Sequence, residues 1–82
     1  MWKRDMSREE AAQVIERFLE HRSTEPQEWN DFVETPQHDK TVEDYRRRCY
    51  ELDPLVNRPG DADPKAVAQL RSIMNSLRSG AV

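Results

Sequence analysis

The chain has 82 residues, a length that fits one small domain with a thin hydrophobic core. Thirteen basic and 16 acidic residues give a formal net charge of −3, which argues against a main role in nucleic-acid binding, because that affinity comes largely from Lys and Arg at the phosphates. The sequence contains no apolar run that could cross a membrane and no hydrophobic signal region, and its single cysteine, Cys49, excludes an internal disulfide, so we expect a cytoplasmic protein.

The first regular element is predicted to begin at Ser7. Residues 1–6 show no apolar periodicity, and we expect them to form a loose leader to the single domain 1–82. Ser7 and Glu10 have the spacing of a capping box, in which each side chain accepts a hydrogen bond from the other residue's backbone N–H. A helix over about 8–21 follows, because apolar residues recur every three or four positions: Ala11, Val14, Ile15, Phe18 and Leu19.

A short second helix is predicted over about 26–34, between two prolines. Pro26 suits a first helical turn, whereas Pro36 disfavours helix in the residue before it. Three apolar side chains share one face of this segment: Trp29, Phe32 and Val33. A helix of about eight residues is not stable alone. We therefore expect it to plug the opening between the first helix and the two later ones.

Two longer helices are predicted in the second half of the chain. The third covers about 40–52, with Asp39 or Thr41 as its N-cap and a narrow apolar seam: Val42, Tyr45, Cys49 and Leu52. The fourth covers about 64–79, with Asp63 as its N-cap, Gly80 as its C′ residue and a broader apolar stripe: Val67, Leu70, Ile73, Met74 and Leu77.

The segment between these two helices is predicted to be irregular. Residues 53–63 contain Asp-Pro twice and Pro59-Gly60, which suits a type II turn, and Leu55 and Val56 would attach the segment to the core. Because no stretch alternates with a period of two, we expect an all-α fold. It would be a compact array of three amphipathic helices and one short helix.

No residue pattern predicts a catalytic, cofactor-binding or metal site. Cys49 falls in the apolar seam, where a thiol behaves as a small hydrophobic group. The spacing of Cys49, His21 and His38 matches no zinc module, and two glycines cannot make a phosphate-binding loop. We therefore expect a protein that is not an enzyme and uses no cofactor.

The run Arg46-Arg47-Arg48 is the strongest candidate for a phosphate contact. Consecutive helical residues diverge by about 100°, so the three guanidinium groups cannot form one patch. Glu43 and Asp44 precede Arg47 and Arg48 by four residues, which favours ion pairs along the helix and leaves Arg46 without a local acid. A nucleic-acid accessory protein remains an alternative and would use five arginines: Arg46, Arg47, Arg48, Arg71 and Arg78.

Acidic residues are concentrated in one third of the chain. Residues 23–45 contain seven acidic residues and one lysine, and they include Trp29. Aromatic side chains inside an acidic rim are typical of a surface that binds a basic protein. The candidate partner-binding residues are Glu28, Trp29, Asp31, Glu43, Asp44, Arg46 and Tyr50.

Two alternatives to this surface remain open. Trp29 could lie wholly in the core, with Tyr50 only covering the helix pair. A helical homodimer of structural role is the other alternative, because a thin core leaves each helix able to bury its stripe against a second copy.

The order Glu28-Trp29-Asn30-Asp31-Phe32, then Asp39, then a helix with Tyr45-Arg46 and Cys49, resembles a group of small, uncharacterised bacterial proteins. These proteins are built around a Glu-Trp-Asp/Asn-Asp-Phe block, and the resemblance spans about residues 7–79. It implies no activity and no binding residue. In size, acidity and helical content the chain is also similar to small immunity proteins that neutralise bacterial toxins, without a shared motif. We therefore expect an immunity- or adaptor-like protein that binds another protein.

Overall fold

A computed structural model of the chain describes residues 4–21, 27–58 and 60–79. Its helices are α1 (Arg8–His21), α2 (Gln27–Glu34), α3 (Lys40–Val56) and α4 (Pro64–Ser79). The described residues contain no strand, so the prediction of an all-α fold is confirmed. None of the described helices is both long enough and apolar enough to span a membrane.

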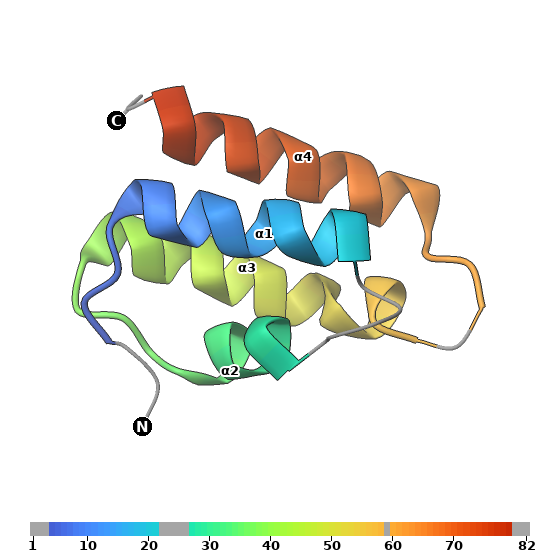
Figure 1. The fold of residues 1–82 in the computed structure, drawn as a ribbon, viewed down its shortest axis with the longest axis horizontal. Coiled ribbons are helices and arrows are strands. Elements are labelled where there is room, and N and C mark those ends of the chain that lie inside the picture. The colour runs from blue at the N-terminus through green and yellow to red at the C-terminus, as the bar shows by residue number, and fades with distance from the viewer. Residues whose placement is uncertain (1–3, 22–26, 59, 80–82) are drawn as a thin grey trace.

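Helix α1 is the centre of the array (Figure 1). It packs along α4 over most of its length and also contacts α2 and α3. The short helix α2 packs against both α1 and α3, on the side of the molecule that faces away from α4. The plug was expected to reach the fourth helix as well, but α2 packs between α1 and α3 without contacting α4.

The predicted helix starts are confirmed by their hydrogen bonds. The Ser7 N–H donates to Glu10 Oε1 at 2.9 Å, and the Glu10 N–H donates to Ser7 Oγ at 3.1 Å, which completes the capping box. Asp39 Oδ1 accepts from the Val42 N–H at 3.0 Å at the start of α3. Asp63 Oδ1 accepts from the Lys65 N–H at 2.9 Å at the start of α4.

Helix α3 is one turn longer than the sequence indicates. Its predicted end at Leu52 was wrong, because the helix continues through Pro54 to Val56. The final turn is held by a hydrogen bond from the Asn57 N–H to the Asp53 carbonyl at 2.8 Å and by burial of the Val56 side chain. Pro54 is exposed, so its ring meets solvent on the outer side of the helix. Leu55, which was expected on the core, is 39% exposed.

The N-terminal leader is docked where the structure describes it. The Met6 side chain is buried, and its N–H donates to Gln37 Oε1 at 3.0 Å. The Arg4 carbonyl accepts from the His38 N–H at 2.9 Å. Residues 4–6 therefore pair with the link between α2 and α3, and the expectation of a loose leader was wrong for them.

Three sequence-based expectations concern residues outside the described part. These are residues 1–3 of the leader, Pro26 at the start of the second helix and Gly80 as a C′ residue. The turn at Pro59-Gly60 is described only at Gly60, whose φ of 86° is the value that the third position of a type II turn requires.

The core is one cluster to which every helix contributes. The side chains of Trp29, Phe32 and Val33 are buried on the inner face of α2, as the spacing predicts. The indole of Trp29 stacks on the ring of Phe18 from α1, with ring centroids 4.2 Å apart. Because α2 is too short to be stable alone, this burial fixes its position and places its C-terminal end beside α3.

Candidate functional site

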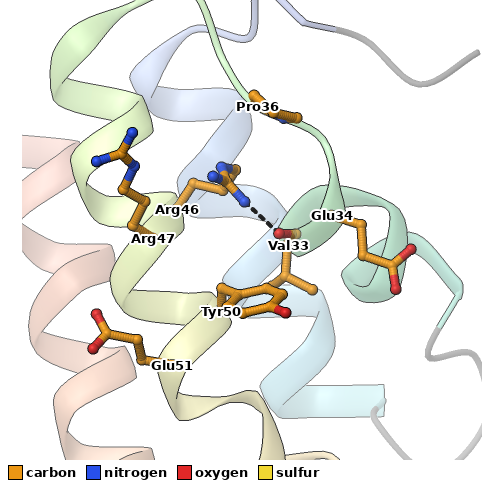
Figure 2. Close-up of a pocket in the computed structure, with 7 residues that line it drawn as sticks. All are labelled: Val33, Glu34, Pro36, Arg46, Arg47, Tyr50 and Glu51. Atoms are coloured by element: carbon orange, nitrogen blue, oxygen red, sulfur yellow. Dashed lines mark hydrogen bonds between the residues drawn. The ribbon is translucent and has the colours of Figure 1, made fainter.

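A groove lies between the end of α2 and the middle of α3 (Figure 2). Its volume is about 620 Å³, within the range of ligand pockets, but it is open to solvent along one side. We call it the α2–α3 groove. It is lined by Val33, Glu34, Pro36, Arg46, Arg47, Tyr50 and Glu51.

Tyr50 is the aromatic residue of the groove. Its side chain is 58% exposed, although the ring is large and mostly apolar. Figure 2 shows the ring extending from α3 toward Val33 on α2, so that it crosses the space between the two helices. An aromatic side chain in this setting offers a partner a large apolar contact together with a hydroxyl group.

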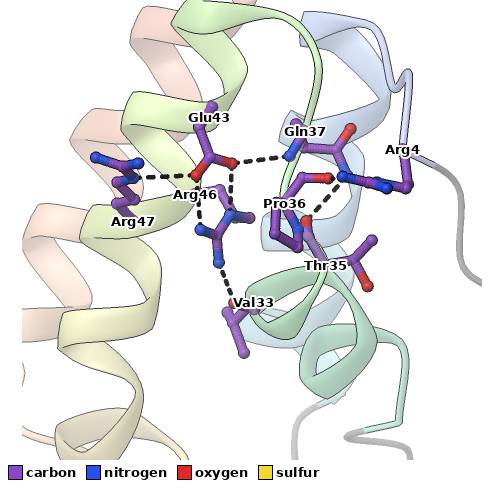
Figure 3. A network of polar contacts seen from close by, with 8 residues as sticks. All are labelled: Arg4, Val33, Thr35, Pro36, Gln37, Glu43, Arg46 and Arg47. Carbon is purple, nitrogen blue, oxygen red and sulfur yellow. Dashed lines mark hydrogen bonds and ion pairs between the residues drawn. The ribbon is translucent and has the colours of Figure 1, made fainter.

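A nearly buried arginine forms one wall of the groove (Figure 3). Arg46 Nη1 donates to the Val33 carbonyl, which has no intrahelical partner so close to the end of α2. Arg46 Nε and Nη2 donate to the two carboxylate oxygens of Glu43, each at 2.7 Å. This fork is the strong geometry for an arginine–carboxylate pair, so Arg46 joins α3 rigidly to α2.

Glu43 connects this wall to the link between the helices. Its Oε1 also accepts from the Gln37 N–H at 2.8 Å, and its Oε2 accepts from Arg47 Nε at 3.0 Å. The hydrogen bond from Arg46 is the main reason that the pKa of Glu43 falls from 4.5 to about 2, against the opposing effect of partial burial. The carboxylate is therefore ionised at neutral pH, and its oxygens are occupied within the protein.

Trp29 is a buried core residue. Its side chain is 1% exposed, it stacks on Phe18, and its indole Nε1 donates to Asp53 Oδ1 at 2.7 Å. The assignment of Trp29 as a partner-binding residue was wrong, and the alternative that places it wholly in the core is correct. The physical reason is that α2 has only one apolar face, and the bulk of the indole closes the core there.

Most of the acidic candidates form hydrogen bonds or ion pairs with other residues of the same chain. Glu28 accepts two hydrogen bonds from Arg17 of α1, at 2.8 and 2.6 Å, and Asp31 accepts one from Gln27 at 2.9 Å. Glu43 belongs to the wall of the groove, and Asp44 is exposed on α3. Among the described residues of the acidic third, Glu28, Asp31 and Glu43 are therefore paired within the protein.

Two acidic residues of the groove were not among the partner-binding residues predicted from the sequence. Glu34 ends α2 and Glu51 follows Tyr50 on α3, and both are exposed at the rim of the groove. Their position depends on how α2 docks against α3, which no local pattern indicates. A usable signal was that Glu51 lies four residues after Arg47 and thus on the same side of the helix.

The arginines of the nucleic-acid alternative are dispersed. Arg46 is buried against Glu43, and the guanidinium of Arg48 lies 5.5 Å from the centre of the Tyr45 ring. Arg78 is paired with Glu16 at 2.9 Å and with Glu9 at 3.4 Å. This arrangement does not form one basic patch on α3 and α4.

The remaining reactive groups do not form a cluster. Cys49 is buried in the seam of α3, and burial raises the pKa of its thiol to about 12 despite the nearby charge of Arg46. No group of three or more histidine, cysteine, aspartate or glutamate side chains in the described ranges is placed to hold a metal ion.

No family model matches the chain, and neither the curated proteins nor the solved structures contain a match. The resemblance carried by residues 28–32 therefore stays a prediction. In the structure, two residues of this block have core roles, since Trp29 and Phe32 are buried.

Proposed function

We propose that this protein is a small cytoplasmic adaptor- or immunity-like domain that binds another protein in the α2–α3 groove and carries out no reaction of its own. The observation that carries the proposal is the exposure of Tyr50 in an open groove with firmly held walls. Exposed aromatic residues beside rigid walls are the usual centres of protein–protein contacts.

The rigidity of the groove supports binding. Arg46 is fixed by three acceptors on two helices, and Glu43 ties it to Gln37. A surface that is already ordered loses little conformational entropy when a partner binds. Tyr50 can then supply apolar contact, with its ring supported on the side of Val33.

The charges of the groove favour a partner segment of mixed charge. Arg46 and Arg47 lie toward the start of α3, while Glu34 and Glu51 line the remaining rim. Since Glu43 already neutralises much of the arginine charge, the rim is close to neutral. A partner helix with an acidic and a basic residue one turn apart fits this pattern better than the uniformly basic partner suggested by the sequence.

The test is capture of a partner by the immobilised protein and by two variants. Tyr50→Ala removes the exposed ring, and Gln69→Ala is a control at an exposed position of α4, outside the groove. We expect a captured protein, once identified and purified, to bind Tyr50→Ala about tenfold or more weakly than the wild type, which is the range of an interface hot spot. Equal binding of the wild type and Tyr50→Ala would reject the groove as the binding site.

A further inference from the structure

Helix α3 has an outer face that no other described helix covers. Its exposed positions follow helical spacing over three turns: Asp44, Arg47, Arg48, Glu51, Pro54 and Leu55. Tyr50 lies at the edge of this face, next to the groove. Two of these side chains, Tyr50 and Leu55, are the exposed large hydrophobic residues of the described part of the chain. The face is therefore mostly charged, with apolar surface beside the charges at Tyr50 and Leu55.

The charges on this face alternate in a way that allows it to pair with itself. Read toward the C-terminus, they are negative at Asp44, positive at Arg47 and Arg48, and negative at Glu51. The side chain of Arg47 is 70% exposed, and its ion pair with Glu43 uses only Nε. Figure 2 shows Arg47 and Glu51 on the same side of α3, one turn apart.

We propose that the outer face of α3 and the α2–α3 groove bind a second copy of this chain through a two-fold axis. Two α3 helices running antiparallel, with the axis at the level of residue 49, place Arg47 of each copy opposite Glu51 of the other. Both charge pairs form at once because the contact is isologous. Tyr50, adjacent to this level, lies near the centre of the interface in both copies.

Affinity and orientation come from different groups in this dimer. Exposed ion pairs contribute little net stability, so the attraction comes from the apolar contact between the two Tyr50 rings, which lie next to the level of the axis. The charges exclude other arrangements, because a parallel pair of α3 helices in register would place like charges opposite each other. A balanced face of this kind fits a second copy better than it fits a strongly basic or strongly acidic partner.

The inference rests on the proposed function, in that both assign protein contacts to the groove. A dimer would hide Tyr50, so a different partner would have to displace the second copy. The two proposals nevertheless fail separately. If the wild-type protein is monomeric, the dimer proposal is overturned. If a captured partner binds Tyr50→Ala as tightly as it binds the wild type, the groove is overturned as a site for another protein.

The test uses two charge reversals and sedimentation equilibrium. Arg47→Glu places two glutamates opposite each other at both contacts of the homodimer, and Glu51→Arg places two arginines there. We expect each variant alone to dimerise about tenfold or more weakly than the wild type. An equimolar mixture of the two variants should form a heterodimer about as strong as the wild-type homodimer, because every contact then joins opposite charges.

Lys65→Glu is the matched control. It makes the same change in net charge as Arg47→Glu at an exposed position of α4, away from the proposed face. It should leave dimerisation unchanged, and circular dichroism should show the same helix content for every variant. The proposal is overturned if the wild type stays monomeric up to about 1 mM, a concentration above the dissociation constants of specific dimers. It is also overturned if the mixture of variants does not associate.

Discussion

The indole Nε1 of Trp29 donates a 2.7 Å hydrogen bond to Oδ1 of Asp53, joining α2 to the last turn of α3. The same carboxylate oxygen accepts from Asn57 Nδ2 at 3.2 Å, and Asn57 Nδ2 also donates to Asn30 Oδ1 at 2.8 Å. The N–H of a buried indole needs an acceptor, and the extra turn of α3 supplies it. Helix α2 and the last turn of α3, which was predicted to be irregular, are therefore joined by one hydrogen-bonded network.

Removing this acceptor should destabilise the fold. Asp53→Ala leaves a buried indole N–H without a partner, which costs about 1–3 kcal/mol in the free energy of unfolding. Asp53→Asn keeps an oxygen acceptor and should cost less. Urea unfolding followed by tryptophan fluorescence measures both, with Asp61→Ala in the exposed loop as the control. A loss for Asp53→Ala no larger than that for Asp61→Ala would show that the bond contributes nothing.

The pair formed by Arg46 and Glu43 should be strongly coupled. Their side chains are only 11% and 15% exposed, so removal of either one leaves the other poorly solvated. We expect Arg46→Ala and Glu43→Ala each to lower the free energy of unfolding by about 2–4 kcal/mol, with a coupling of about 1–3 kcal/mol in the double mutant. Arg46→Lys should be a poor substitute, because an ammonium group cannot form the fork.

The control for this cycle is the pair of Arg17 and Glu28. It joins α1 to α2 at 2.6 Å, but its side chains are 50% and 33% exposed. Solvent-exposed pairs contribute about 0–1 kcal/mol, so the same double-mutant cycle should give a much smaller coupling there. Equal coupling for the two pairs would mean that burial does not set the strength of the Arg46 wall.

The helices could be predicted from the sequence because their signals are local. Apolar spacing and capping residues identified α1 and α4 with their observed bounds. At α3 the same logic failed, since Pro54 normally marks an end. Tertiary contacts extend the helix, because Val56 is buried in the core and Asp53 accepts a hydrogen bond from Trp29. These contacts depend on residues that lie more than 20 positions away, as in the bond from Trp29.

The candidate site was harder to predict than the helices. Tyr50 was identified because it lies off the apolar seam, which is a local property. Arg46 was thought to lack a local acid because only i±4 neighbours were compared, yet Glu43 at i−3 pairs with it. Glu34 reaches the groove only through the docking of α2, so its role could not be inferred from spacing along the chain.

Acid should weaken the fold through Glu43. The pKa of this carboxyl is lowered from 4.5 to about 2 in the folded state, chiefly by the hydrogen bond from Arg46. Between these two values the unfolded chain binds more protons than the folded one, so stability falls as the pH falls. The contribution is fully present above pH 4.5 and is lost by about pH 2. Urea unfolding across this window should show a smaller decline for Glu43→Gln than for the wild type.

Glu16 provides the comparison for this pH effect. Arg78 also lowers the pKa of Glu16, but that carboxyl is solvent-exposed. Glu16→Gln should therefore change the acid dependence less than Glu43→Gln does. If the free energy of unfolding falls with pH equally in both variants and in the wild type, other carboxyl groups cause the acid sensitivity.

Cys49 should be unreactive in the folded protein. Its thiol is buried, and burial raises its pKa to about 12, so the thiolate that attacks disulfide reagents is scarce at pH 8. We expect labelling by a chromogenic disulfide reagent to be slow in buffer and complete at once in denaturing urea. In the Asp53→Ala variant the Cys49 thiol should be labelled faster, because the less stable fold opens more often. Immediate labelling of the native wild type would contradict the position of Cys49 in the core.

Replacing Pro54 should stabilise the protein. Within α3 this proline has no N–H to donate to the carbonyl four residues earlier, and proline inside a helix costs about 3 kcal/mol. Pro54→Ala restores the donor but gives the unfolded chain more freedom, which costs about 0.4–1 kcal/mol, so the gain should be about 2–2.6 kcal/mol in thermal or urea unfolding. Pro64→Ala is the control, because Pro64 is the first residue of α4, where no donor is missing and the ring favours the helix. That variant should be slightly destabilised, and a loss of stability in Pro54→Ala as well would mean that the last turn of α3 depends on the proline ring.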